Sequence, residues 1–190
     1  MIIGITGKMG SGKSTIGDYI QKCGGGYFIY NVADPIKKIA EIFGFSKESL
    51  YTTQEAKLEI HENWGVSARE FLQKFGTEVA REISRIIPLK IRRGLWIDIF
   101  INNYDKNKNY IIPDVRFLSE EKMIRDLGGI IIRTKRASNE NKTLFASHVS
   151  EKEMESIEAD YEIDNDALSL SEAQGVVLNI LDKIKVDNIV

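Results

Sequence analysis

Residues 1–14 read MIIGITGKMGSGKS, and this stretch decides the class of fold. The part from Gly7 to Ser14 matches the pattern GxxxxGK(S/T), in which glycines let consecutive backbone N–H groups turn inward around a phosphate. The apolar residues before it predict a buried strand over Met1–Thr6, and Ile16 and Ile20 after it recur at helical spacing. A phosphate loop between a strand and the positive end of a helix indicates a nucleoside triphosphate as ligand.

The phosphate loop, residues 7–14, supplies most of the predicted nucleotide site. Lys13 is placed to reach the β- and γ-phosphates, and the Ser14 hydroxyl to ligate Mg²⁺. The residues expected to bind the nucleotide here are Gly7, Lys8, Met9, Gly10, Ser11, Gly12, Lys13, Ser14 and Thr15. The alternative is a glycine-rich turn without a ligand, and the agreement of pattern and context disfavours it.

The composition narrows the class of protein. With 190 residues, 43% of them hydrophobic and 28% charged, the chain is typical of one globular domain with a sizeable core. A net charge of −2 gives no broad basic surface, so we expect no nucleic-acid partner. No apolar run approaches the ~20 residues of a membrane span, and the single cysteine, Cys23, cannot form an internal disulfide. We therefore expect a cytoplasmic protein acting on a small molecule; the oligomeric state stays open, a homodimer included.

Apolar segments of strand length recur along the chain, with helical patterns between them. They are Met1–Thr6, Tyr27–Val32, Asn109–Ile112, Gly129–Arg133 and Tyr161–Ile163. This alternation predicts an α/β fold in which a five-stranded parallel sheet lies between two layers of helices. The functional loops are then expected where the strands end, along one edge of the sheet.

Two insertions interrupt this core, which we assign to residues 1–33, 107–133 and 151–190. Residues from about 34 to 106 have almost wholly helical patterns and predict a helical lobe, and residues from about 134 to 150 are polar and predict a lid.

Capping signals predict where the helices begin. Asp34 before Pro35 resembles a helix N-cap followed by proline at the first helical position, opening a helix that Gly44 stops. Ser67–Glu70 has the spacing of a capping box, as does Ser150–Glu153.

Asp114 follows the third predicted strand at the edge where the phosphate loop is expected. Because Pro113 has no backbone N–H to donate, we expect the strand to end at Ile112. Asp114 is then a candidate for holding Mg²⁺, directly or through water, and the alternative is a turn or capping residue.

Phosphoryl transfer between two anions needs positive charge more than it needs a base, which directs attention to basic residues. The candidates are Arg69, Arg116, Arg133, Lys135 and Arg136, with Lys37, Lys57 and Arg81 weaker. Each of these taken alone is an ordinary surface residue.

Several segments resemble the phage-type deoxynucleoside monophosphate kinases. They are DPIK at 34–37, SAREFLQKFGTE at 67–78, DVRF at 114–117, GGIIIR at 128–133, HVSE at 148–151 and IDND at 163–166. The resemblance covers nearly the whole chain. It implies a P-loop kinase core with a helical monophosphate-binding lobe and a lid, which transfers the γ-phosphate of ATP, with Mg²⁺, to a deoxynucleoside monophosphate.

The resemblance also implies roles for individual residues. Lys13, Arg116 and Arg136 would be catalytic, and Arg133 and Asn165 would join the phosphate loop in binding ATP, with Asn165 near the adenine. The acceptor nucleotide would be bound by Asp34, Lys37, Lys57, Arg69, Gln73, Thr77, Asp114 and Arg116, and the metal by Ser14 and Asp114. Structural alternatives stay open for a few of these and their neighbours: a helix cap for Asp34, a turn for Asn165, a structural role for His148, and either core packing or base stacking for Trp64.

Other classes of P-loop protein remain as alternatives. Lys8, five residues before Lys13, is where dimeric partition-type ATPases place an extra lysine, but Met9 replaces their usual glycine and the helical insertion suits a small acceptor. Dephospho-coenzyme A kinase and the animal-type phosphomevalonate kinase share the expected scaffold. A GTPase switch is disfavoured, because Asn107–Tyr110 lacks the acidic residue of a guanine-reading NKxD segment.

Overall fold

The computed structural model describes residues 1–53, 55–86, 94–136, 149–166 and 168–187. The chain divides into two compact units, one formed by residues 1–31 and 105–190 and the other by residues 32–104. Within the described ranges, no helix combines the length and the apolar character needed to cross a membrane.

The first unit contains a five-stranded sheet in which every strand pair is parallel. Its strands are β1 (Ile2–Thr6), β2 (Tyr27–Ile29), β3 (Asn109–Ile112), β4 (Ile130–Lys135) and β5 (Tyr161–Asp164), in the spatial order β2-β3-β1-β4-β5. The predicted parallel sheet is thus confirmed. Because β1 is central and all strands run the same way, the loops that follow β1, β3, β4 and β5 meet at one edge.

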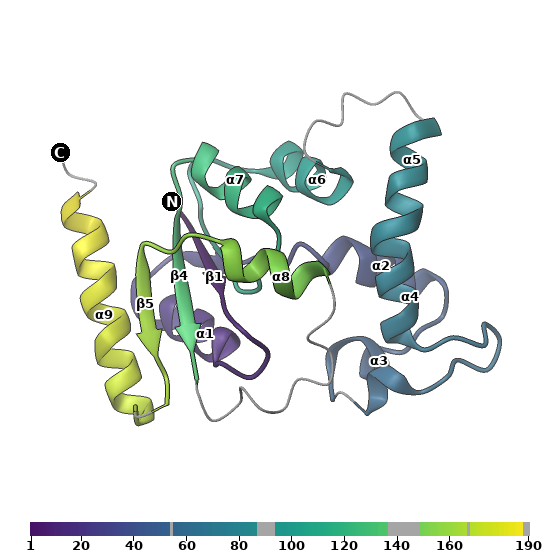
Figure 1. The fold of residues 1–190 in the computed structure, drawn as a ribbon, viewed down its shortest axis with the longest axis horizontal. Helices are drawn as coiled ribbons and strands as arrows, with labels where there is room; N and C mark the ends of the chain where they lie inside the picture. The colour runs from purple at the N-terminus through teal and green to yellow at the C-terminus, as the bar shows by residue number, and fades with distance from the viewer. Residues whose placement is uncertain (54, 87–93, 137–148, 167, 188–190) are drawn as a thin grey trace. The chain divides into compact units, whose positions relative to one another are not determined.

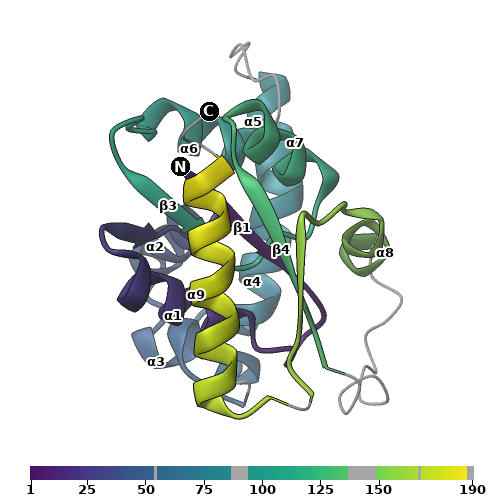
Figure 2. The ribbon, with the colours of Figure 1, turned by 90° about the vertical axis from the view of Figure 1, so that its left-hand side faces the viewer.

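Helices cover both faces of this sheet (Figures 1 and 2). Helices α1 (Lys13–Gly24) and α9 (Leu170–Asp187) pack together over one face, where Ile3, Ile16 and Val177 join the same buried cluster. Helix α7 (Leu118–Asp126) packs on β1 and β4, with α8 (Val149–Ser156) beside it. A Cβ added at Gly4 would lie 2.7 Å from Ile124 Cδ1, so the missing side chain lets α7 approach β1 closely. The predicted three-layer α/β/α arrangement is confirmed.

Three strand ends differ from the prediction, and the smallest difference is in β5, which ends at Asp164 and not at Ile163. β2 ends at Ile29 and not at Val32; its last pairing is Ile29 with Ile111, and Val32 already belongs to the second unit. β4 continues past Arg133 to Lys135, because it is paired on its far side with β5, where Lys135 lies opposite Asp164. β3 ends at Ile112, as expected from Pro113.

The second unit is built from short helices. They are α2 (Asp34–Ile42), α3 (Lys47–Tyr51), the 3₁₀ turn η1 (Ala56–Leu58), α4 (Ala68–Lys74), the π-helical turn η2 (Phe75–Val79), α5 (Ala80–Ile86) and α6 (Leu95–Asn103). Its buried centre contains Ala40, Phe45, Leu50 and Ala68.

One of the predicted caps in this unit is confirmed and one is wrong. Ser67 caps α4, because its side chain accepts a hydrogen bond from the Glu70 N–H at 3.2 Å. Asp34, however, is the first residue of α2, and the N-cap is Ala33, which offers no side-chain acceptor. The Asp34 carboxylate lies instead 3.6 Å from Lys37 Nζ, one helical turn along.

Candidate active site

The phosphate loop leaves the fully buried strand β1 and enters α1 through two glycines with unusual backbone angles. Gly7 has φ +142° and Gly12 has φ +97°, a region that side chains rarely adopt. Both positions are also filled by neighbours: a Cβ on Gly7 would collide with the Thr134 carbonyl oxygen, and one on Gly12 with Asn165 Nδ2. Glycine is therefore required here by backbone conformation and by space.

Lys13, the first residue of α1, folds back over the phosphate loop. Its Nζ donates hydrogen bonds to the carbonyl oxygens of Gly7, at 2.5 Å, and Lys8, at 3.0 Å. The same Nζ lies 3.5 Å from Asp114 Oδ1. The ammonium group is thus held at the mouth of the loop, where a bound phosphate would replace the carbonyl oxygens as its acceptor.

Asp114 and Arg116 stand on the loop after β3, next to Lys13. Arg116 Nε donates to Asp114 Oδ2 at 2.8 Å, so the three residues form a chain of alternating charges. The loop between them is fixed to β1, because Val115 N–H donates to the Ile5 carbonyl at 2.9 Å and Thr6 Oγ1 to the Val115 carbonyl at 2.8 Å. The structure therefore brings Lys13 next to Asp114 and Arg116, which lie about a hundred positions further along the sequence.

The donor atoms near the loop fit a magnesium ion that takes most of its ligands from a substrate. Ser14 is exposed, and Asp114 offers a carboxylate at the same edge of the sheet. Among the described residues no group of three or more His, Cys, Asp or Glu side chains is arranged to hold a metal by itself. In phosphoryl-transfer sites one or two protein oxygens bind Mg²⁺ together with substrate phosphates and water, and Ser14 and Asp114 offer oxygens of this kind.

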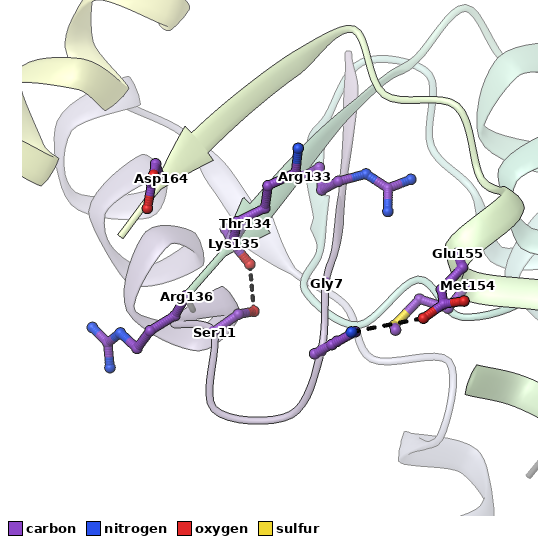
Figure 3. A pocket seen from close by; sticks show the side chains of 10 residues that line it. Gly7, Ser11, Arg133, Thr134, Lys135, Arg136, Met154, Glu155 and Asp164 are labelled. Atoms are coloured by element: carbon purple, nitrogen blue, oxygen red, sulfur yellow. Dashed lines mark hydrogen bonds and ion pairs between the residues drawn. The ribbon is translucent and has the colours of Figure 1, made fainter. Parts of the chain in front are cut away.

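A cavity of about 350 Å³ opens beside the phosphate loop (Figure 3). It is lined by Gly7, Lys8, Ser11, Arg133, Thr134, Lys135, Arg136, Met154, Glu155 and Asp164. Four of these ten residues are basic, so the cavity favours an anionic ligand. Lys8 Nζ lies 3.7 Å from Glu155 Oε1 across it.

The two predicted arginines at the end of β4 differ in their surroundings. Arg133 donates from its guanidinium group to the Ile157 carbonyl and lies 3.8 Å from Glu162, so it is tied to the core beside the cavity. Arg136 is exposed and extends in a different direction from Arg133 (Figure 3). Residues 137–148 of the predicted lid, including His148, lie outside the described residues.

Asn165 packs directly on the phosphate loop. Its side chain is 6% exposed, and Nδ2 donates to the Ser11 carbonyl at 3.0 Å. Its own backbone N–H donates to the Lys135 carbonyl at 2.8 Å. On the other side of the loop, Ser11 Oγ and Thr134 Oγ1 are 2.7 Å apart. The sequence resemblance implied a place near the adenine for Asn165, and gave no signal for these contacts with Ser11.

Glu120 is a residue of this edge that the sequence analysis missed. It lies in the first turn of α7, is 7% exposed, and its Oε2 accepts hydrogen bonds from the backbone N–H groups of Arg116, at 2.8 Å, and Phe117, at 3.1 Å. Burial raises the pKa of this carboxyl to about 7, although the two hydrogen bonds act in the opposite direction. The sequence signal for Glu120 was a glutamate at the third position of a helix, as in a capping box. Because the N-cap residue is Phe117 and not Ser or Thr, the capping-box pattern could not be recognised in the sequence.

The predicted acceptor residues of the second unit lie on α2, η1 and the α4–η2 segment. Lys37 Nζ lies 4.8 Å from the centre of the Tyr51 ring, and Lys57 is half-buried in η1. Arg69 and Gln73 are one turn apart on α4 and so share a face, while Thr77 Oγ1 donates to the Gln73 carbonyl at 2.8 Å.

Trp64 is neither fully buried nor isolated. Its side chain is 51% exposed, its Nε1 donates to the Phe43 carbonyl at 2.6 Å, and the two rings lie 5.4 Å apart.

Comparisons with known proteins agree with this geometry. The family model described as "Deoxynucleotide monophosphate kinase" matches residues 40–174. A relative, the "Putative deoxynucleotide monophosphate kinase" of Acanthamoeba polyphaga mimivirus, is 34% identical over 173 residues, which cover 84% of each chain.

Among solved structures, the fold is similar to shikimate kinase from Aquifex aeolicus, with a TM-score of 0.56, 15% identity and coverage of 98% and 99% of the two chains. It is also similar to dephospho-CoA kinase from Campylobacter jejuni, with a TM-score of 0.52, 16% identity and 98% of both chains covered. At these identities the two likenesses concern the fold alone. The family match spans most of the helical second unit and the loop that carries Asp114 and Arg116, and with it the chain belongs to the deoxynucleotide monophosphate kinase family.

Proposed function

We propose that this protein transfers the γ-phosphate of ATP to a deoxynucleoside monophosphate, giving the diphosphate and ADP. In this step an oxygen of the acceptor phosphate bonds to the γ-phosphorus, and the bond to the β–γ bridging oxygen breaks with its electron pair leaving on ADP. The observation that carries the proposal is the Lys13–Asp114–Arg116 charge chain at the mouth of the phosphate loop, in a member of this family.

The donor side of the reaction rests on the first unit. The backbone N–H groups of residues 7–15 surround the triphosphate, and Lys13 exchanges its two loop carbonyls for phosphate oxygens. Ser14 and Asp114 hold Mg²⁺, which neutralises charge on the phosphate oxygens when bound. Arg133, Arg136 and Asn165 complete the ATP side, from the ends of β4 and β5.

The acceptor side combines Arg116 with residues of the helical lobe. Arg69 and Arg116 bind the acceptor phosphate, which an arginine fork matches in shape and charge. Asp34, Lys37, Lys57, Gln73 and Thr77 line the rest of the acceptor site. Residues 34–106 act as the monophosphate-binding lobe and residues 134–150 as the lid, and their closure excludes water so that the acceptor, and not water, is phosphorylated.

The scheme uses residues of one chain, and a homodimer stays open. A single cysteine fits a reducing compartment, and we place the reaction in the cytoplasm.

The test is a coupled ADP-release assay with ATP, Mg²⁺ and a panel of deoxynucleoside monophosphates. We expect turnover with at least one of them, and a loss of roughly 100-fold or more in kcat for Lys13→Ala, because the positive charge beside the transferring phosphate is gone. Lys22→Ala, at the other end of α1, is the matched control and is expected to keep its activity. The same assay is run with dephospho-coenzyme A or phosphomevalonate in place of the monophosphates, and turnover with one of these alone would overturn the proposal.

A further inference from the structure

Glu120 is the one charged side chain found buried among the described residues. Burying a carboxylate is costly unless hydrogen bonds compensate it, so a retained one needs an explanation. The proposed reaction as set out above gives Glu120 no role.

The contacts of Glu120 are with the backbone of the loop that carries Arg116. One oxygen, Oε2, receives the N–H groups of both Arg116 and Phe117. From the opposite side, β1 holds the intervening Val115 through Ile5 and Thr6. Residues 115–117 are therefore fixed from two elements, and the Arg116 side chain leaves a backbone that cannot shift without breaking these bonds.

Helix capping alone accounts for only half of this arrangement. A glutamate at the third helical position that accepts from the N-cap N–H is an ordinary cap, and the bond from Phe117 fits that description. The hydrogen bond from the Arg116 N–H is not part of the cap, because Arg116 is the residue before the N-cap Phe117. Glu172 of α9 shows what a plain cap is: it accepts from the Ser169 N–H at 2.8 Å and stays exposed.

We infer that Glu120 is a positioning residue, which holds the backbone of Arg116 so that its guanidinium group stands beside Asp114 and at the acceptor phosphate. This inference rests on the proposed role of Arg116. If Glu120 acts in this way, activity depends on the position of its side-chain oxygen and not on its negative charge.

Three substitutions separate position from charge. In Glu120→Asp the carboxylate keeps its charge but is retracted by one methylene group, and in Glu120→Gln an uncharged carbonyl oxygen stays in reach of both N–H groups. We expect Glu120→Asp and Glu120→Ala to lower kcat/KM for the monophosphate by roughly 10- to 100-fold, since a misplacement of about 1 Å can cost this much. For Glu120→Asp and Glu120→Ala, KM for ATP is expected to change by less than about 3-fold. Glu120→Gln is expected to keep kcat within about 3-fold of wild type, because an oxygen in the same place preserves the position of the Arg116 backbone.

Glu172→Ala is the matched control, because it removes a capping carboxylate from the same unit without touching the loop. It is expected to lower stability without changing KM for either substrate. An active Glu120→Asp together with an inactive Glu120→Gln would overturn the inference, as would Glu120 variants that behave like Glu172→Ala.

Hydrogen exchange of the backbone amides of residues 115–117 tests the inference without any substrate. We expect exchange at least roughly 10-fold faster in Glu120→Asp than in wild type, because two N–H groups lose their acceptor, and no change in Glu172→Ala. Unchanged exchange in Glu120→Asp would overturn the inference even if the variant has a lowered kcat/KM for the monophosphate. Wild-type protein that phosphorylates no monophosphate would instead refute the proposed function, so the two failures are distinguishable.

Discussion

At the scale of single residues, Glu120 predicts how stability depends on pH. Its folded-state pKa of about 7 lies above the ordinary value of 4.5, because the desolvation of the buried carboxyl outweighs the hydrogen bonds from the Arg116 and Phe117 N–H groups, which lower the pKa. Of the nearby charges, the Asp114 carboxylate raises the pKa and the Arg116 guanidinium lowers it. The folded protein therefore holds this proton more tightly than the unfolded chain between these two pH values. Across that window the contribution of Glu120 to stability falls as the pH rises.

Glu120→Gln removes this titration while it keeps an oxygen for both N–H groups. We expect the variant to gain stability relative to wild type as the pH rises from about 4.5 to about 7, by up to about 3 kcal/mol. Urea unfolding of both proteins at pH 5 and pH 8 measures the difference. Glu172→Gln is the control with the opposite direction, because its hydrogen bonds with Ser169 lower the pKa of Glu172. Parallel curves for wild type and Glu120→Gln would contradict the prediction.

At the scale of elements, the phosphate loop is shaped by the ends of β4 and β5 as well as by its own glycines. Asn165 holds the Ser11 carbonyl from one side, and Thr134 holds the Ser11 hydroxyl from the other. Both contacts are buried, and so they fix the loop before a nucleotide binds. Preorganisation of this kind lowers the cost of ordering the loop around a phosphate.

Asn165→Ala is therefore expected to weaken ATP binding by roughly 5- to 30-fold, the effect of one buried hydrogen bond left unmade. Asn165→Asp is expected to be worse, because a carboxylate cannot donate to Ser11 and adds negative charge beside the phosphates. Isothermal titration calorimetry with ATP and Mg²⁺ measures both. Asn103→Ala removes an exposed amide that donates to the Ile99 carbonyl within α6, and equal losses in this control and Asn165→Ala would refute the prediction.

Some features of these elements can be predicted from the sequence and others cannot, for physical reasons. The phosphate loop and the end of β3 are predictable, because glycine geometry and the missing N–H of Pro113 act locally. The partners of Ser11 are not, because Asn165 lies 154 residues away and the sheet order brings them together.

The helix that follows the Ser67 cap shows the limit of periodicity. Apolar residues at Phe71, Leu72, Phe75 and Val79 predict one continuous α-helical face. The π-helical turn η2 interrupts it over Phe75–Val79, and Val79 is left exposed. A π-helical turn is wider than an α-helical turn, so it changes the angle between successive side chains. A sequence pattern with a period of 3.6 residues cannot predict this change. Such turns recur at functional sites, and this one carries Thr77, a predicted acceptor residue.

At the scale of the whole molecule, the proposed ATP-binding residues all lie in one unit of the chain, and most of the proposed acceptor-binding residues lie in the other. The phosphate loop belongs to the unit of residues 1–31 and 105–190, and Arg69 to the unit of residues 32–104. A substitution in the second unit is therefore expected to change the kinetics of the acceptor only, whereas Arg116 and Glu120 act on the acceptor from the first unit.

Arg69→Ala is accordingly expected to raise KM for the acceptor monophosphate by roughly 10- to 100-fold, the value of a charged hydrogen bond. KM for ATP is expected to stay within about 2-fold of the wild-type value, because Arg69 makes no contact with ATP in the proposed scheme. Steady-state kinetics with each substrate varied in turn measure the two constants. Arg85→Ala is the control from the same unit, since Arg85 is exposed and pairs at 2.8 Å with Glu82. An unchanged acceptor KM in Arg69→Ala would remove Arg69 from the acceptor site and leave Arg116 as the anchor for the acceptor phosphate.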